Sequence, residues 1–355
     1  MKTHFSFPAL FLRGALVVAC AALISTSSLL ILLRTQAPPA AMIVWMRGTQ
    51  GQALYVIDTQ RRVQTPLIEP PSAPVIEVPH ASRDGLRAVF QTSDHGRLTI
   101  QVVDARRGVL YSTGTETAER LAALSPDGRQ LAYWATNDTR LSIRFQSWHL
   151  AIRDLDTGES RIITEQNALL PYDRPLWSPD GQQLAVRFWS GAQDAGVHLI
   201  SASGGSSEGI SELTPSSELS WSPDGTRIAF DSSRDRNTEI YLLDLPSRRL
   251  QNLTQHLDND FQPTWSPDGS QIVFVSNRAD GGGIYRMNAA GADFQRVVEA
   301  GWQPLWSPTG DEIAFISQRN GDTAMYMIKA DGSDLHLVTA LDDTARFVGW
   351  YASEN

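Results

Sequence analysis

The chain reads Trp177-Ser178-Pro179-Asp180-Gly181 near its centre, and the same five residues return at 221–225 and at 265–269. A fourth copy, at 306–310, has threonine in place of the aspartate, and weaker copies occupy 81–85 and 124–128. The glycines that close the six copies are 43, 53, 44, 44 and 41 residues apart. The chain is therefore built from internal repeats of about 40–45 residues.

Each repeat predicts four short β-strands. The copy at 221–225 is followed by the alternating run 227–230 (Arg-Ile-Ala-Phe), a polar loop and a second run at 240–244 (Ile-Tyr-Leu-Leu-Asp). Such alternation of β-branched and aromatic residues is typical of strands. In the pentapeptide, proline fixes φ at about −65°, aspartate suits the next turn position and glycine accepts positive φ. The pentapeptide therefore predicts a tight hairpin turn after the innermost strand, with its tryptophan packed between repeats.

A four-stranded repeat of this length is one blade of a β-propeller, and the two ends of the chain predict how the ring closes. Residues 43–45, 54–58 and 61–67 match the second, third and fourth strands of a blade, and residues 347–350 match a first strand. A C-terminal strand that completes the N-terminal blade leaves no exposed sheet edge. We therefore predict an all-β propeller over residues 42–355 with seven four-stranded blades. Six blades are the alternative, if a weak copy around Gly85 or Gly128 does not form one.

Residues 14–33 are twenty uncharged, mostly apolar residues between Arg13 and Arg34. As a helix they would extend about 30 Å, the thickness of the hydrocarbon core of a bilayer. Positive charge is concentrated before this segment. The positive-inside rule therefore predicts a cytoplasmic tail at 1–13, a transmembrane signal-anchor helix at 14–33, a linker at 34–41 and a periplasmic or extracellular propeller. The alternatives are a cleaved signal peptide and a lipoprotein signal around Cys20.

The sequence carries no strong signature of catalysis, metal binding or nucleic-acid binding. The net charge is −9 and no clustered Lys/Arg face is present, which argues against a nucleic-acid partner. No pair of histidines has metal-ligand spacing. A G-x-S-x-G match at 205–209 lies in a predicted turn between strands, whereas a nucleophile elbow joins a strand to a helix. We therefore predict no catalytic residue, no metal and no cofactor.

The pentapeptide, followed by Ile-Ala-Phe at 228–230 and Ile-Tyr at 240–241, resembles the repeat of the TolB-type, WD40-like propeller family. The resemblance covers residues 42–352. It implies a non-catalytic module outside the cytoplasm that binds a protein or another cell-envelope ligand. Propellers of the oligogalacturonate lyase type have similar blades and use a histidine-ligated metal. A metal-dependent carbohydrate-active enzyme is therefore one alternative function, with His80 and His256 as the histidines that could face the mouth of the ring. A sensory or structural module whose partner carries the activity is the other.

One face of the ring is predicted to bind the ligand. In a propeller, the loops that enter the innermost strands and the loops between the second and third strands meet on the same face. Aromatic residues and arginines are enriched where proteins recognise partners. If these loops are instead ordinary solvated turns, each arginine pairs with an aspartate of its own loop at little energetic gain. The candidate ligand-binding residues are Phe261, Trp302, Arg234, Arg278, Arg319, Asp258 and Asp260.

Overall fold

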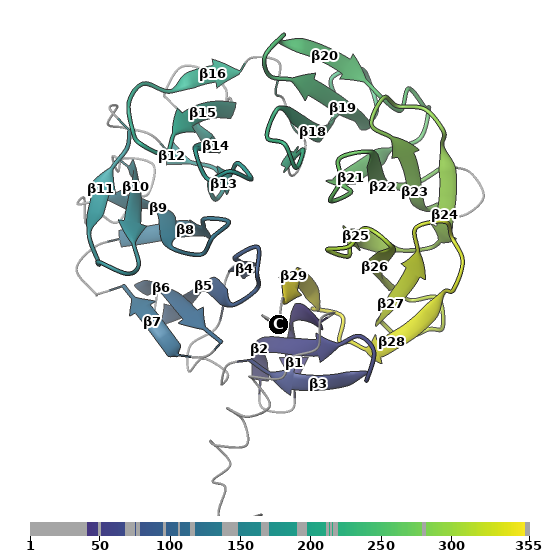
Figure 1. The fold of residues 1–355 in the computed structure, drawn as a ribbon, viewed down its shortest axis with the longest axis horizontal. Helices are drawn as coiled ribbons and strands as arrows, with labels where there is room; N and C mark the ends of the chain where they lie inside the picture. The colour runs from purple at the N-terminus through teal and green to yellow at the C-terminus, as the bar shows by residue number, and fades with distance from the viewer. Residues whose placement is uncertain are drawn as a thin grey trace, which may run out of the picture.

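A computed structural model describes residues 41–48, 51–67, 75, 79–94, 97–105, 107–113, 118–136, 148–164, 170–189, 197–210, 213, 215, 219–278 and 282–351. Every helix or strand assigned within these ranges is a β-strand (Figure 1). No helix in the described part of the chain combines the length and apolar character needed to cross a bilayer. The predicted tail at 1–13 and membrane helix at 14–33 lie outside the described residues, as does the linker except for Ala41, where the first strand begins.

The strands form seven antiparallel sheets arranged as blades around a central opening (Figure 1). From the centre outwards, blade 1 contains β29 (Arg346–Tyr351), β1 (Ala41–Gly48), β2 (Gly51–Asp58) and β3 (Val63–Pro66). Blade 2 contains β4 (His80–Ala81), β5 (Arg87–Asp94), β6 (Arg97–Asp104) and β7 (Gly108–Ser112). Blade 3 contains β8 (Ala118–Leu124), β9 (Gln130–Thr136), β10 (His149–Asp154) and β11 (Ser160–Ile162).

In blade 4 the inner strand is split into β12 (Leu170–Pro171) and β13 (Leu176–Trp177), followed by β14 (Gln183–Trp189), β15 (Val197–Ser201) and β16 (Glu208–Ile210). Blade 5 contains β17 (Leu219–Trp221), β18 (Arg227–Ser232), β19 (Glu239–Asp244) and β20 (Arg249–Asn252). Blade 6 contains β21 (Asp260–Trp265), β22 (Gln271–Ser276), β23 (Gly283–Asn288) and β24 (Gln295–Glu299). Blade 7 contains β25 (Trp302–Trp306), β26 (Glu312–Ser317), β27 (Ala324–Lys329) and β28 (His336–Ala340). The prediction of seven blades is confirmed.

The ring closes in blade 1 as predicted. The C-terminal strand β29 pairs antiparallel with β1, from Ala41 opposite Tyr351 to Trp45 opposite Arg346. Without β29, blade 1 would expose the whole edge of β1, so the two ends of the described chain hold the ring shut.

Seven apolar clusters hold the blades together, and each lies at one interface between neighbouring blades. The interface of blades 6 and 7, for example, buries Val273 and Ile284 from one side against Phe315 and Tyr326 from the other. The interface of blades 7 and 1 contains Trp350 of β29. Burial between blades rather than within one central core is therefore the main source of stability.

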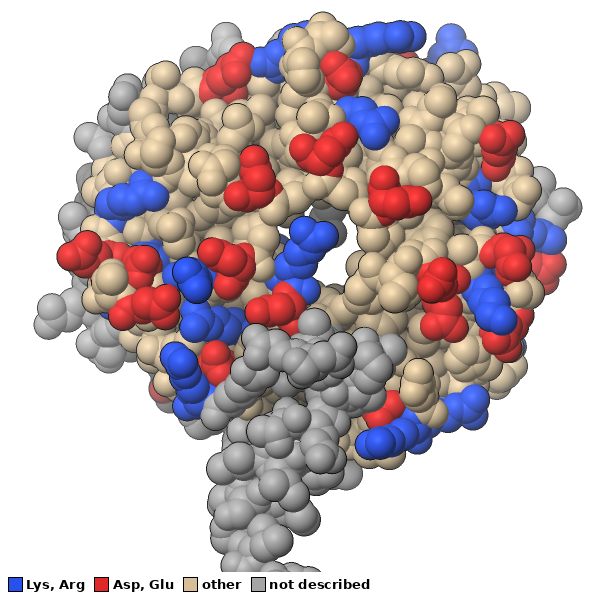
Figure 2. Space-filling view, viewed as in Figure 1, with Lys and Arg blue, Asp and Glu red and all other residues tan. Residues whose placement is uncertain are grey.

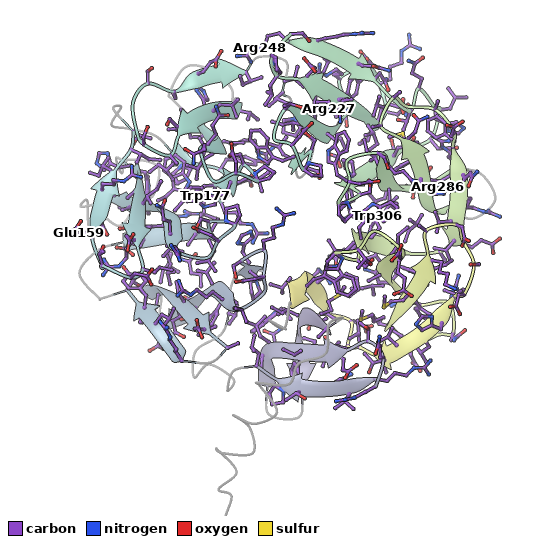
Figure 3. The ribbon with its side chains drawn as sticks, in the orientation of Figure 1. Glu159, Trp177, Arg227, Arg248, Arg286 and Trp306 are labelled. Carbon is purple, nitrogen blue, oxygen red and sulfur yellow. The ribbon has the colours of Figure 1, made fainter. Side chains whose placement is uncertain are left out.

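Three of the four pentapeptide tryptophans, Trp177, Trp265 and Trp306, form a hydrogen bond to the blade that precedes their own. Figure 3 shows Trp177 and Trp306 on the inner side of the ring, while Glu159 and Arg248 lie at its outer edge. Both tryptophans are buried, and their indole N–H groups donate to a backbone carbonyl of the preceding blade. These bonds join Trp177 to Ala123 (3.1 Å), Trp265 to Ser220 (3.2 Å) and Trp306 to Thr264 (3.2 Å).

The hairpin turns pack in the same order. Gly269 has a φ of +71°, a conformation that glycine adopts without strain. A Cβ added there would lie 3.5 Å from Cδ of Pro223 in the preceding turn. Proline and glycine therefore recur together because each turn is placed against its predecessor.

Candidate functional site

The three predicted rim arginines occupy the same position in successive blades. Each follows a strand phenylalanine by four residues, and its guanidinium group lies over that ring and over the tyrosine paired with it on the next strand. Such cation–π contacts contribute about 0.5–2 kcal/mol, depending on desolvation. The distances to the ring centroids are 5.5 and 4.8 Å for Arg234 over Phe230 and Tyr241, 5.7 and 5.3 Å for Arg278 over Phe274 and Tyr285, and 5.9 and 5.4 Å for Arg319 over Phe315 and Tyr326.

Arg278 also forms an ion pair with Asp260, which brings two of the predicted site residues together. The distance from Nη2 of Arg278 to Oδ2 of Asp260 is 2.9 Å. The Asp260 side chain is 0 % exposed and that of Arg278 is 15 % exposed. The pair therefore lies inside the blade, where it anchors the beginning of β21 to the loop after β22.

Arg319 and Arg234 each donate a hydrogen bond to a neutral oxygen. Arg319 donates from Nη2 to the backbone carbonyl of Glu299 at 2.8 Å, and Arg234 donates from Nε to the Ser232 hydroxyl at 3.4 Å. Asp235, beside Arg234, accepts a hydrogen bond from the Tyr241 hydroxyl. Burial, together with that bond, raises the pKa of Tyr241 to about 12, so the hydroxyl stays protonated. The three arginines thus form different hydrogen bonds and ion pairs, although they share one repeat position.

Asp258 lies in a tightly held loop between β20 and β21. The Asn237 side chain donates to the backbone carbonyls of His256 (2.9 Å) and Asp258 (3.0 Å). Glu239, which is buried, accepts the backbone N–H of His256 at 2.9 Å. Nδ1 of His256 in turn accepts the backbone N–H of Asp258 at 3.1 Å. The loop is therefore fixed before any ligand arrives.

Phe261 and Trp302 are half-buried near the beginnings of β21 and β25. They face equivalent partners across their sheets, Val275 and Ile316. Their place in the blade matches the repeat position inferred from sequence. Ligand binding by the seven rim residues stays a prediction.

The ring encloses a central channel (Figure 2), and the residues that line it were not predicted from the sequence. It has a volume of about 770 Å³ and is lined by residues of all seven blades. Ligand sites in proteins commonly have volumes of about 300–1,000 Å³. Figure 2 shows the opening at the centre of the ring, with basic atoms inside it and acidic side chains around its mouth.

Bulges in the inner strands shape the channel wall. Leu121, Gln262 and Gln303 have φ values of +54°, +56° and +53°, and at each of them the pairing register of the strand shifts. Each bulge is bonded to the preceding blade through its backbone N–H. The acceptors are Oε1 of Gln91 for Leu121 (3.4 Å), Oδ2 of Asp231 for Gln262 (3.3 Å) and Oε1 of Gln262 for Gln303 (3.2 Å).

The charged lining of the channel is mainly basic. Arg174, Arg187 and Arg346 line it, and Asp173 is the one carboxylate among the described lining residues. Arg187 forms an ion pair with Asp173, donates to the carbonyl of Pro215 at 3.2 Å and lies over a tyrosine ring. Three arginines against one aspartate leave an excess of two positive charges among the described lining residues.

His80 contributes a neutral imidazole to the same wall. Its Nδ1 accepts the backbone N–H of Leu124 at 3.3 Å, so the neutral ring carries its proton on Nε2. Burial, and then the positive charge of Arg174, lower the pKa of His80 to about 3. Arg174 of blade 4 and His80 of blade 2 thus interact electrostatically along the channel.

A family model described as the TolB beta propeller domain matches residues 139–346, more than half of the chain. The chain belongs to the TolB β-propeller family. A curated relative, Protein TolB homolog of Chlorobium luteolum, is 29 % identical over 171 residues, which are 46 % of this chain and 33 % of that protein. The chain thus matches about a third of the length of this relative.

Two solved structures illustrate the range of proteins that share the fold. TolB from Acinetobacter baumannii has a TM-score of 0.51 and 16 % identity, with 88 % of this chain and 83 % of that chain covered. The oligogalacturonate lyase from Vibrio parahaemolyticus has a TM-score of 0.60 and 16 % identity, with 82 % of this chain and 91 % of that chain covered. At these identities the likeness shows the fold alone.

The described channel does not fit a histidine-ligated metal. Among the described residues, no three histidine, cysteine or carboxylate side chains gather in a way that could hold an ion. The channel contains one described histidine, whose Nδ1 is occupied by Leu124, and one described carboxylate, which is paired with Arg187. A metal site built from two or more histidines would need ligands that these residues do not supply.

Proposed function

We propose that this protein is a non-catalytic binding module of the cell envelope, which takes a protein or another envelope ligand at its loop-rich face and in its central channel. In this proposal residues 14–33 anchor the chain in a membrane and the propeller lies in the periplasm or outside the cell. The apolar segment and its flanking charges support the anchor. Membership of the TolB propeller family supports a binding role.

The observation that carries the proposal is the channel. It is large enough for a ligand, reaches all seven blades and offers hydrogen-bond donors on a wall with apolar patches. The wall is also fixed in advance, because bonds between blades hold the bulges that form it. A binding site on rigid elements loses little conformational entropy when the ligand enters.

A metal-dependent carbohydrate-active enzyme is the second candidate. The lyase neighbour, with its TM-score of 0.60, supports it through the fold. The donors of the described channel favour the binding module, since they do not form a metal site.

Affinity capture from envelope extracts tests the proposal with full-length protein in detergent. We expect a stoichiometric envelope component to be captured by the parent. Leu305→Trp, which places an indole in the channel, should lose it. Leu337→Trp is the control, because Leu337 lies on an outer strand and is 43 % exposed. Capture by Leu305→Trp at the level of the parent would contradict binding in the channel, and metal-dependent cleavage of oligogalacturonate would contradict a non-catalytic role.

A further inference from the structure

The outer wall of the ring exposes large apolar side chains on one side only. Each of the outer strands β28, β3, β7 and β11 has one such side chain, and these strands belong to the consecutive blades 7, 1, 2 and 3 (Figure 1). The outer strands of blades 4, 5 and 6, which are β16, β20 and β24, have none within their bounds. The exposed side chains are Leu337 (43 %), Val63 (51 %), Val109 (62 %) and Ile162 (60 %). A single exposed apolar residue is ordinary, but their restriction to one side of the ring indicates a surface that meets a partner.

The described chain enters the propeller on this same side. Ala41, the first residue of β1, pairs with Asp58, and Asp58 pairs with Val63. Neighbouring strands lie about 4.8 Å apart, so Val63 is about 10 Å from the point of entry. If residues 14–33 anchor the chain as proposed, the chain from Leu33 to Ala41 spans at most about 29 Å even when fully extended. The end of blade 1 that carries Val63 is then held close to the bilayer.

The turns at this end of blades 1 and 2 present arginines. Arg61 and Arg62 lie between β2 and β3, Arg107 lies between β6 and β7, and all three are exposed. The carboxylates of the same turns, Asp58 and Asp104, are buried and accept the backbone N–H groups of Arg61 (2.7 Å) and Arg107 (3.0 Å). Nε of Arg61 lies 3.7 Å from Oδ2 of Asp58, yet its side chain stays 74 % exposed. The surface that a partner would meet at these two turns is therefore basic.

The equivalent turn of blade 5, across the ring (Figure 1), shows that the turn geometry does not require an apolar residue. Asp244 pairs with Arg249 there in the way that Asp58 pairs with Val63. Arg249 is exposed, so blade 5 has a charged side chain at the position that valine occupies in blade 1. The exposed valine is thus a feature of the blade at which the chain enters the ring.

Exposed valines beside exposed arginines suit the surface of a phospholipid bilayer. Apolar side chains of proteins that lie on a membrane enter the boundary between headgroups and acyl chains. Guanidinium groups form charge-assisted, bidentate hydrogen bonds with phosphate oxygens. The corresponding turn of blade 7 has the exposed carboxylates of Asp331 and Asp334, which lipid phosphates would repel. Because the ring is convex, a flat bilayer meets few blades, and these charges favour contact with blades 1 and 2.

We propose that blades 1 and 2 rest on the membrane in which the chain is anchored, with Val63 and Val109 in the headgroup layer and Arg61, Arg62 and Arg107 on lipid phosphates. These five residues form the membrane corner of the propeller. The inference rests on the proposed function, which supplies the anchor. It leaves the loop-rich face free for a ligand, because the turns of the membrane corner lie at the opposite ends of the strands.

Fluorescence quenching tests the orientation with the full-length chain reconstituted in vesicles of phosphatidylcholine and phosphatidylglycerol. The vesicles contain a lipid with a nitroxide on its headgroup, and the one native cysteine is replaced by Cys20→Ser. A fluorophore is attached through Gln60→Cys or Pro246→Cys, which are exposed equivalent positions in the turns of blades 1 and 5. We expect quenching of the blade 1 label to be at least about threefold stronger. Equal quenching of the two labels would overturn the inference.

Variants separate contact with the membrane from tethering near it. The double variant Val63→Asp with Val109→Asp keeps the tether and should reduce quenching of the blade 1 label at least about twofold. The matched control is Gln251→Asp with Gln295→Asp, which adds the same charge on β20 and β24 and should leave quenching unchanged. Thermal melts verify that both variants are folded. Unchanged quenching in the valine variant would show that the tether alone sets the distance, and would overturn the contact.

The arginines have a separate signature. Arg62→Gln with Arg107→Gln should reduce quenching in vesicles that contain phosphatidylglycerol, and raising the salt concentration should do the same to the parent. A dimer of the parent in detergent that dissociates in the valine variant would assign the membrane corner to a second copy of the chain and overturn the membrane contact.

Flotation of the same vesicles distinguishes failure of the inference from failure of the anchor. If the chain floats with the vesicles but the two labels are quenched equally, the inference fails while the proposed anchor stands. If the chain does not float, the anchor fails and the inference that depends on it fails as well.

Discussion

Arg278→Ala should be far more destabilising than the same substitution at the two equivalent arginines. Arg278 is the partner of Asp260, whose side chain is 0 % exposed. Removing the guanidinium group leaves a carboxylate inside the blade with its ion pair broken. Arg319→Ala removes a bond to a backbone carbonyl in an exposed position, and Arg234→Ala removes a long bond to a serine hydroxyl.

The expected magnitudes follow from these partners. Breaking a buried ion pair by removing one member costs about 3–5 kcal/mol, because the remaining charge is uncompensated. Each of the three substitutions also loses the cation–π contacts, about 0.5–2 kcal/mol. We therefore expect Arg278→Ala to lower the free energy of unfolding by about 4–6 kcal/mol, and Arg319→Ala and Arg234→Ala by about 1–2 kcal/mol.

Urea denaturation followed by tryptophan fluorescence measures these differences, provided that the slope of the transition is unchanged among the variants. The double variant Arg278→Met with Asp260→Asn removes both charges and should recover most of the lost stability. A loss for Arg278→Ala no larger than that for Arg319→Ala would refute the claim that Asp260 is a buried charge held by Arg278. Because Arg278 supports the blade, loss of ligand binding in its variants must be corrected for any unfolded fraction.

The ring closure, one glycine and the channel histidine provide three further predictions. Deletion of residues 346–355 removes β29 and exposes β1, so size-exclusion chromatography and thermal melts should show aggregation or a large fall in melting temperature; a monomer that melts like the parent would contradict the closure. Gly283→Ala should prevent folding, because φ is +145° and its Cβ would lie 2.1 Å from a carbonyl oxygen, whereas Gly321→Ala, which meets no atom within 4 Å but keeps a φ of +95°, should cost about 1–3 kcal/mol in urea denaturation. The pKa of His80 is about 3 in the folded chain and 6.5 in the unfolded one, so the unfolded state binds the additional proton and stability falls as pH drops from about 6.5 towards about 3. His80→Gln should lose less stability over that window than the parent, and identical pH profiles would refute the burial of His80.

The sequence was sufficient to predict the blades because each one carries its own strand and turn signals. Even the weak copy at 81–85 forms a blade, although Ala81 stands where the other copies have tryptophan or leucine. Its second and third strands, β5 and β6, each extend over eight residues, whereas the inner strand β4 has two. The predicted closure by residues 347–350 succeeded for the same reason, since a strand without a partner at one end of the chain matched a missing strand at the other.

The rim shows what a repeat pattern does not reveal. The repeat pattern correctly placed Arg234, Arg278 and Arg319 at the same position in three blades. A shared position, however, can reflect either a shared ligand or a shared structural contact. The phenylalanine four residues earlier and the tyrosine on the next strand were visible in the sequence, and together they could have indicated the stacking. The ion pair of Arg278 was not predictable, because Asp260 precedes it by eighteen residues and meets it only when β21 pairs with β22.

The channel residues were not predicted from the sequence, because one channel position holds different residues in different blades. Gln262 and Gln303 stand three residues before their tryptophans and share one structural task, a bond to the next blade. Arg174 occupies the same position in blade 4. A search for repeated residues does not detect a position at which the residue changes from blade to blade.

Departures of this kind are where a binding function is most readily placed. A position that is the same in every blade must satisfy the contacts that every blade makes, which leaves little freedom for a ligand. Arg346 stands where blades 6 and 7 have Phe261 and Trp302, and His80 stands where they have Thr264 and Leu305. These substitutions change the chemistry of the channel wall while the strand that carries them keeps its pairing. Stability and ligand binding thus depend on different residues. The repeated residues hold the ring together. The residues that differ between blades set the charge and the hydrogen-bond donors that a ligand would meet.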